Sequence, residues 1–270
     1  MQFLYFVYER GRNMKYLNDV SYKDCVGKVC KSKSSGDFKI VKYNDAKDVV
    51  IQFFNTGYET TVQLGNIRNG EVKDPHSPSV HGIGVTGTKY PTKINGRNTN
   101  EYMLWQSMLQ RCYSDTFKKR YPTYEGCEAS ENFKSYEHFY EWCHKQIGFG
   151  NKGWHLDKDL LIKGNKVYSE DSCIFIPKEV NTLLTKSEVS RGEYLIGVHW
   201  SKSNKAFVAQ VNKNKGKQEY LGYFNTELEA FNAYKQAKES FIKEQANKFK
   251  SQIDPRAYEA LMNYTVEITD

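Results

Sequence analysis

The chain has 270 residues, enough for two or three compact domains, and its 39% hydrophobic and 14% aromatic content can supply buried cores. Its 39 Lys and Arg against 32 Asp and Glu give a net charge of +7, which favours polyanionic partners such as nucleic acid. No apolar run reaches the ~18 residues of a membrane span, so we expect no membrane partner.

The opening segment and the cysteines indicate the compartment. Residues 1–16 contain a short apolar stretch without a positive leader or a small-residue cleavage site, so we expect no signal peptide. Six scattered cysteines fit a reducing environment better than a disulfide framework. An alternative role for four of these cysteines is a zinc site built from Cys112, Cys127, Cys143 and Cys173. The sequence has no Cys-x-x-Cys pair, and this spacing argues against such a site. The prediction is a cytoplasmic protein.

The N-terminal third predicts β structure. Between residues 26 and 67, four short runs rich in apolar, β-branched and aromatic residues are separated by turn formers such as Asn44-Asp45 and Asn69-Gly70. Such a pattern favours a small antiparallel barrel or curled sheet, with Thr61 to Ile67 as its last strand. Residues 74–84, rich in proline and glycine, predict an extended linker. We therefore expect a small β-barrel-like domain with a linker over residues 1–92.

The middle of the chain changes to helical spacing. Two sets of apolar residues recur every three or four positions: Tyr102, Trp105, Met108, Leu109 and Cys112, then Phe133, Tyr136, Phe139, Tyr140 and Cys143. Each set predicts a helix with one buried face. Trp154 to Leu161 and Val167 to Ile176 then predict two strands, followed by a helix over Pro177 to Leu184. We expect a central α+β domain over residues 93–190.

In the C-terminal stretch, apolar and polar residues alternate again from Leu195 to Phe224, with polar turns near residues 201–205 and 212–216. This pattern predicts a three-stranded meander. Thr226 with Glu229 forms the sequence of a capping box, so a helix should begin there and cover one face of the sheet. A last helix should open at Asp254-Pro255. The C-terminal domain is placed at residues 191–270, and the whole chain in the α+β class.

One set of C-terminal residues matches a known DNA-binding family. The matching residues are Gly197-Val198, Trp200, Ala209, Val211, the run Tyr220-Leu221-Gly222-Tyr223-Phe224, Thr226, Glu229-Ala230, Ala233-Tyr234 and Ala237. On these residues the stretch resembles the AP2/ERF domain. The resemblance implies a three-stranded antiparallel sheet, packed on one helix, that binds double-stranded DNA. The family's arginines and tryptophans on the binding face are here largely replaced, so its target sequence does not transfer.

The candidate DNA contacts follow from this arrangement. The face opposite the helix should carry polar side chains that read base edges in the major groove, while lysines neutralise phosphates. The candidate DNA-binding residues are His199, Trp200, Lys202, Lys205, Gln210, Asn212, Lys217 and Tyr220. The alternative is a solvated sheet face above a core Trp200.

The central domain resembles a second family, the HNH endonucleases of bacteriophages, which often carry AP2-type domains downstream. The resemblance rests on residues 154–161, the Gly164-Asn165 turn, residues 169–177 and Asn181 on the following helix. It implies a ββα unit, a relationship to homing endonucleases and a viral origin, with the host cell cytoplasm as the location.

The HNH resemblance implies that Asp157 and Asn181 are metal ligands, for Mg²⁺ if the centre is active. Lys158 stands where the family keeps its general base, and a lysine protonated near pH 7 is a poor base. His155, on the same strand face as Asp157, is the candidate substitute, and Ser172 stands where the family has its central asparagine.

The expected function is therefore a double-stranded DNA-binding protein with a degenerate nuclease centre. The alternatives are an active metal-dependent HNH endonuclease that nicks or cleaves DNA, and a module that binds an unknown protein partner.

Overall fold

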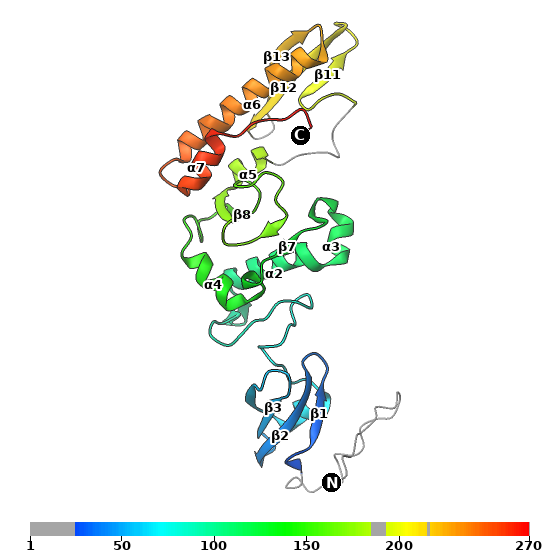
Figure 1. Ribbon diagram of the computed structural model, residues 1–270, viewed down its shortest axis with the longest axis vertical. Helices are drawn as coiled ribbons and strands as arrows, with labels where there is room; N and C mark the ends of the chain where they lie inside the picture. The colour runs from blue at the N-terminus through cyan, green and yellow to red at the C-terminus, as the bar shows by residue number, and fades with distance from the viewer. Residues whose placement is uncertain (1–24, 185–192, 215–216, 270) are drawn as a thin grey trace. The chain divides into compact units, whose positions relative to one another are not determined.

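The computed structural model describes residues 25–184, 193–214 and 217–269 (Figure 1). The described chain mixes helix and sheet, as expected. It divides into two compact units: one ends at Pro91 and includes Ser135–Glu137, and the other holds Thr92–Lys134 and the chain from His138 onward. The expected boundary near residue 190 falls within residues 185–192, outside the described part.

The first unit contains a four-stranded antiparallel sheet in the order β1-β2-β3-β4. Its elements are β1 (Val29–Ser32), β2 (Gly36–Asp45), β3 (Asp48–Phe53), β4 (Glu59–Val62) and the helix α1 (Leu64–Asn69). Phe38, Ile40 and Ile51 are completely buried between the sheet and α1 with its neighbours. Within the described residues the edge strands β1 and β4 each pair on one side only, so the sheet is open and the expected barrel-like closure is wrong.

Two local predictions in this unit also need correction. The run expected to be a strand from Thr61 to Ile67 leaves the sheet after Val62, because Leu64 and Ile67, three residues apart, bury one face of α1. The expected linker is anchored: the buried carboxylate of Asp74 accepts hydrogen bonds from the Thr56 hydroxyl at 2.5 Å and the Ser77 hydroxyl at 2.9 Å.

The middle of the chain is built from helices and short strands. Its elements are β5 (Lys93–Ile94), β6 (Arg97–Asn98), α2 (Asn100–Tyr113), α3 (Asp115–Arg120), the 3-10 turns Pro122–Tyr124 and Asn132–Lys134, β7 (Glu128–Ala129), α4 (Tyr136–His144), β8 (Trp154–Asp157), β9 (Val167–Tyr168), β10 (Ile174–Pro177) and α5 (Lys178–Leu184). The buried face of α2 carries Trp105, Met108 and Leu109. The cysteines at 112, 127, 143 and 173 are buried as free thiols.

The strand expected over Val167 to Ile176 is split in two. Its first part, β9, pairs in parallel with β7, and its second part, β10, pairs antiparallel with β8. Between them the Ser172 hydroxyl donates to the Val167 carbonyl oxygen at 2.7 Å and stabilises a turn. The order β8, β10, α5 is therefore a ββα unit whose two strands are joined by a long loop.

The C-terminal part confirms the expected three-stranded antiparallel sheet, in the order β11-β12-β13. Its elements are β11 (Val198–Ser201), β12 (Ala206–Asn214), β13 (Lys217–Phe224), α6 (Glu227–Phe249) and α7 (Pro255–Met262). Both halves of the capping box form at the start of α6: the Glu229 amide donates to the Thr226 hydroxyl, and the Thr226 amide donates to the Glu229 carboxylate.

Helix α6 belongs to two cores. Near its start, Phe231 and Tyr234 pack on Val211 of the sheet. Further along, α6 and α7 pack on the ββα unit in a second cluster (Figure 1). The buried members of that cluster are Leu160, Ile174, Ile176, Val180, Ile242, Ala246, Phe249, Ile253, Ala257 and Leu261. The ββα unit and the C-terminal sheet are thus joined by one long helix that contributes to both.

Among the helices of the described residues, none is long and apolar enough to cross a membrane.

Candidate nucleic-acid interface

The strand register assigns each side chain of the C-terminal sheet to one of two faces. Val198 pairs with Ala209, and Ala209 and Val211 are fully buried against α6, so these residues define the helix-facing side. Gly197 allows this close approach. A Cβ atom at that position would lie 2.1 Å from the Tyr234 ring, and its φ of 77° is a conformation that favours glycine.

The opposite side, which we call the outer face, consists of four rows of paired residues: Ser201–Ala206, His199–Val208–Tyr223, Gln210–Tyr220 and Asn212–Gln218. His199 and Asn212 are exposed, Gln210 is half-buried, and Tyr220 is 55% exposed. None of these rows contains a carboxylate. Four predicted contact residues, His199, Gln210, Asn212 and Tyr220, therefore share one accessible surface without negative charge.

Trp200 does not lie on the outer face. It alternates with His199 along β11 and pairs with Phe207, and the two rings meet edge to face with centroids 4.9 Å apart. This places the indole on the helix-facing side, at the end of the sheet, where it is 37% exposed. Trp200, one of the predicted DNA contacts, is therefore not on the outer face with His199.

Tyr223 belongs to the outer face, although the sequence pattern did not indicate it. Tyr220 and Tyr223 are three residues apart, a spacing that puts side chains on opposite faces of a regular strand. The register shifts between Ala209 and Gln210, so Leu221 is an extra residue on β13, and this bulge turns both tyrosines to the same side. Their rings meet at 5.3 Å, and Tyr223 is 54% exposed.

The tyrosine pair is held by the turn between β11 and β12. The Asn204 side-chain amide donates to the Tyr223 hydroxyl at 2.7 Å and to the Ser201 hydroxyl at 3.0 Å. These bonds fix Tyr223 relative to the turn.

The lysines around this sheet differ in their surroundings. Lys202 and Lys205, on the turn after β11, are exposed, and neither forms an ion pair with another described residue. Lys213 is paired with Glu219 at 2.6 Å. The side chain of Lys217, also a predicted phosphate contact, lies outside the described residues. Two of the predicted lysines therefore remain available to an anionic partner.

The predicted catalytic residues lie on the ββα unit. His155 on β8 is exposed, and its Nδ1 is 3.5 Å from the side-chain nitrogen of Asn181 on α5. Partial loss of solvent around the ring lowers the pKa of His155, and the positive charges of Lys178 and Arg111 lower it further. The fold therefore brings His155 together with Asn181.

Asp157 is buried at the end of β8. Its Oδ1 accepts hydrogen bonds from the backbone amides of Leu160 at 2.7 Å and Asp159 at 3.0 Å, so it stabilises the turn that follows. Burial, and then the neighbouring charge of Asp159, raise the pKa of Asp157 to about 6.

The side chain of Lys158 contacts the loop that follows β8. Its ammonium donates to the Asn165 carbonyl oxygen at 2.9 Å and to Asp159 at 3.2 Å, and it lies over the Tyr168 ring. The Asn165 side-chain amide in turn donates to the carbonyl oxygens of Lys158 and Val167. Lys158 and Asn165 therefore brace the loop, and Ser172 fixes the turn before β10.

Both metal ligands that the HNH resemblance implies, Asp157 and Asn181, have partners within the protein. Asn181 lies against His155, while Asp157 uses one carboxylate oxygen to hold the backbone. Within the described residues no three His, Cys, Asp or Glu side chains form a group that could hold a metal ion. We therefore derive no cleavage step from this site.

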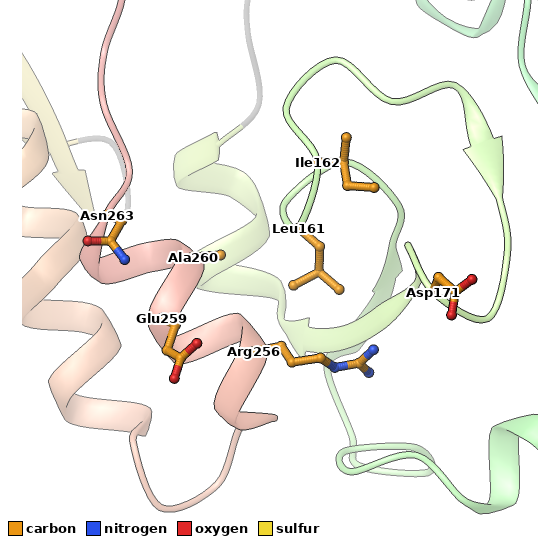
Figure 2. Close-up of a pocket in the computed structure, with 7 residues that line it drawn as sticks. All are labelled: Leu161, Ile162, Asp171, Arg256, Glu259, Ala260 and Asn263. Atoms are coloured by element: carbon orange, nitrogen blue, oxygen red, sulfur yellow. The ribbon is translucent and has the colours of Figure 1, made fainter.

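An open pocket of about 400 Å³ lies between α7 and the loop after β8 (Figure 2). It is lined by Leu161, Ile162, Asp171, Arg256, Glu259, Ala260 and Asn263. The guanidinium of Arg256 is engaged by Asp254 at 2.9 Å. His155, Asp157 and Asn181 are not among the lining residues, so the pocket is separate from the predicted catalytic group.

Comparison with protein-family models, with curated proteins and with solved structures finds no match to this chain.

Proposed function

We propose that this protein binds double-stranded DNA through the outer face of its C-terminal sheet. The observation that carries the proposal is a carboxylate-free outer face with exposed His199, Asn212 and Tyr220, next to a turn that carries two unpaired lysines. The net charge of +7 adds a general attraction to polyanions.

The dimensions of the sheet suit the major groove. Strands in a sheet lie about 4.8 Å apart, so three of them span roughly 10 Å of backbone. The major groove of B-DNA is about 12 Å wide and admits such an element. Side chains of the outer face would then meet base edges, while Lys202 and Lys205 would reach phosphates at the groove wall.

The ββα unit has a different part in the proposal. From the sequence motifs we propose that the protein is a phage-type relative of the HNH and AP2-containing homing endonucleases and that it acts in the host cell cytoplasm. Lys158 and Asn165 brace its loop, and Asp157 holds a backbone turn. The ββα unit also shares a core with α6, so it supports the helix behind the sheet, and its nuclease centre is degenerate.

A salt titration of DNA affinity tests the proposal. The full chain is titrated with a fluorescent duplex of mixed sequence at several salt concentrations. Each phosphate contact contributes about 0.9 to the slope of log affinity against log salt. The double variant Lys202→Ala, Lys205→Ala should therefore reduce the slope by about 1.8.

The control variant is Lys243→Ala, which removes an exposed lysine from α6, the helix behind the sheet. It should leave the slope unchanged. If the native chain forms no complex at low salt, or if the turn lysines and the helix lysine have equal effects, the outer face is not the DNA-binding surface.

A further inference from the structure

Besides Ser201, Ala206 and the buried Val208, the side chains of the outer face are mainly of two chemical kinds. Beyond His199, three amides, Gln210, Asn212 and Gln218, form one group, and the exposed rings of Tyr220 and Tyr223 form the other. Arginine, lysine, aspartate and glutamate are absent from the four paired rows. The free lysines stand on the turn at the edge, where phosphates would pass.

Base edges in the major groove match side chains by chemistry. Guanine presents two acceptors that arginine or lysine reads, and cytosine presents a donor that a carboxylate reads. Adenine presents one donor and one acceptor that an amide side chain reads with two bonds, and thymine presents a methyl group that apolar side chains contact. The outer face lacks the cationic side chains that read guanine and the carboxylates that read cytosine. It holds amides, which read adenine, and aromatic rings, which can contact the thymine methyl group.

His199 does not change this assignment. Its imidazole can donate to N7 of a purine, an acceptor that adenine and guanine share. A single such bond does not distinguish the two bases.

The aromatic half of the face is preorganised. The bulge at Leu221 places both tyrosines on one side, and the Asn204 amide holds the Tyr223 hydroxyl at 2.7 Å. A ring held in this way contacts a methyl group with little further loss of side-chain freedom. Gln210 is paired directly with Tyr220, so an amide and a ring stand side by side, as adenine and thymine do in an A·T pair.

We propose that the outer face selects A·T-rich duplex DNA, with Gln210 and Asn212 reading adenine and with Tyr220 and Tyr223 contacting the thymine methyl group. This inference rests on the proposed DNA-binding function and adds the class of target.

The first experiment is a binding selection with the full chain. A pool of duplexes with a randomised central segment is bound, recovered and sequenced over several rounds. We expect a contiguous A·T-rich block in the recovered sequences. A G·C-rich block, or recovery without base preference, overturns the inference while leaving DNA binding intact, whereas failure to retain any duplex overturns the proposed function itself.

The second experiment replaces every thymine of the selected block by uracil, which removes only the methyl group. The methyl lies in the major groove, so an A·T preference read from the minor groove would survive this replacement. We expect the native chain to lose at least threefold in affinity. Unchanged affinity overturns the assignment of the tyrosines.

Variants separate a direct contact from a structural effect. Tyr223→Phe keeps the ring and should keep the difference in affinity between thymine and uracil duplexes, whereas Tyr223→Ala should reduce this difference. Gln210→Ala should weaken selection for adenine at one position, and Gln236→Ala, an exposed amide on α6, is the matched control. If Tyr223→Ala retains the full thymine dependence, or if Gln236→Ala and Gln210→Ala act alike, the inference fails.

Discussion

Replacing Asp157 with asparagine should stabilise the fold at neutral pH. The carboxylate is 6% exposed, and its burial, with the charge of Asp159, raises its pKa from 3.8 to about 6. Asparagine retains an oxygen that can accept the amide hydrogens of Leu160 and Asp159. The difference between 3.8 and 6 corresponds to about 3 kcal/mol, and we expect a gain on the order of 1 to 3 kcal/mol in the free energy of unfolding.

The pH dependence of this effect has a definite sign. Between pH 3.8 and about 6 the folded state holds a proton that the unfolded state has lost, so the native protein gains stability as the pH falls through this window. Asp157→Asn has no such titration, and its advantage should be complete above pH 7 and vanish below pH 4. Urea unfolding at several pH values measures this.

The control for this prediction is Glu125→Gln, which removes an exposed carboxyl group. It should leave both the stability and its pH dependence nearly unchanged. A lower free energy of unfolding for Asp157→Asn at pH 7.5, or the same pH profile as the native chain, would refute the reasoning about the buried charge.

Three further predictions concern the joined architecture and the chemistry. Ile242→Ala, in the core that α6 shares with the ββα unit, should lower the free energy of unfolding by about 2 to 5 kcal/mol. Hydrogen-exchange protection of β10 and β12 should fall together. A loss of protection confined to one of these strands would show that the two units unfold independently. Gly197→Ala should lower the free energy of unfolding by about 2 kcal/mol or more, because the new Cβ meets the Tyr234 ring. Thermal unfolding measures this, and an unchanged melting temperature would contradict that contact. Supercoiled plasmid incubated with Mg²⁺ should stay intact on a gel, and nicking that disappears in Asp157→Ala would instead establish an active nuclease.

Local signals in the sequence determined much of the secondary structure. The apolar spacing over Trp105 to Cys112 predicted α2, and Thr226 with Glu229 predicted where α6 begins. Asp254 caps α7 as its position before Pro255 indicated. The alternation from Val198 to Phe224 predicted three strands in a meander. These predictions succeed because caps, helical periodicity and tight turns depend on residues close together in the chain.

Pairings and packing between distant residues were decided only by the tertiary structure. Nothing local indicates that β9 would pair with β7, or that Ile242 would pack with Ile176. Alternation alone also overlooked Tyr223, because a single extra residue in β13 reverses which side chains share a face. The candidate face could therefore be predicted as a region of the sequence, but its chemistry depends on the register that the folded sheet adopts.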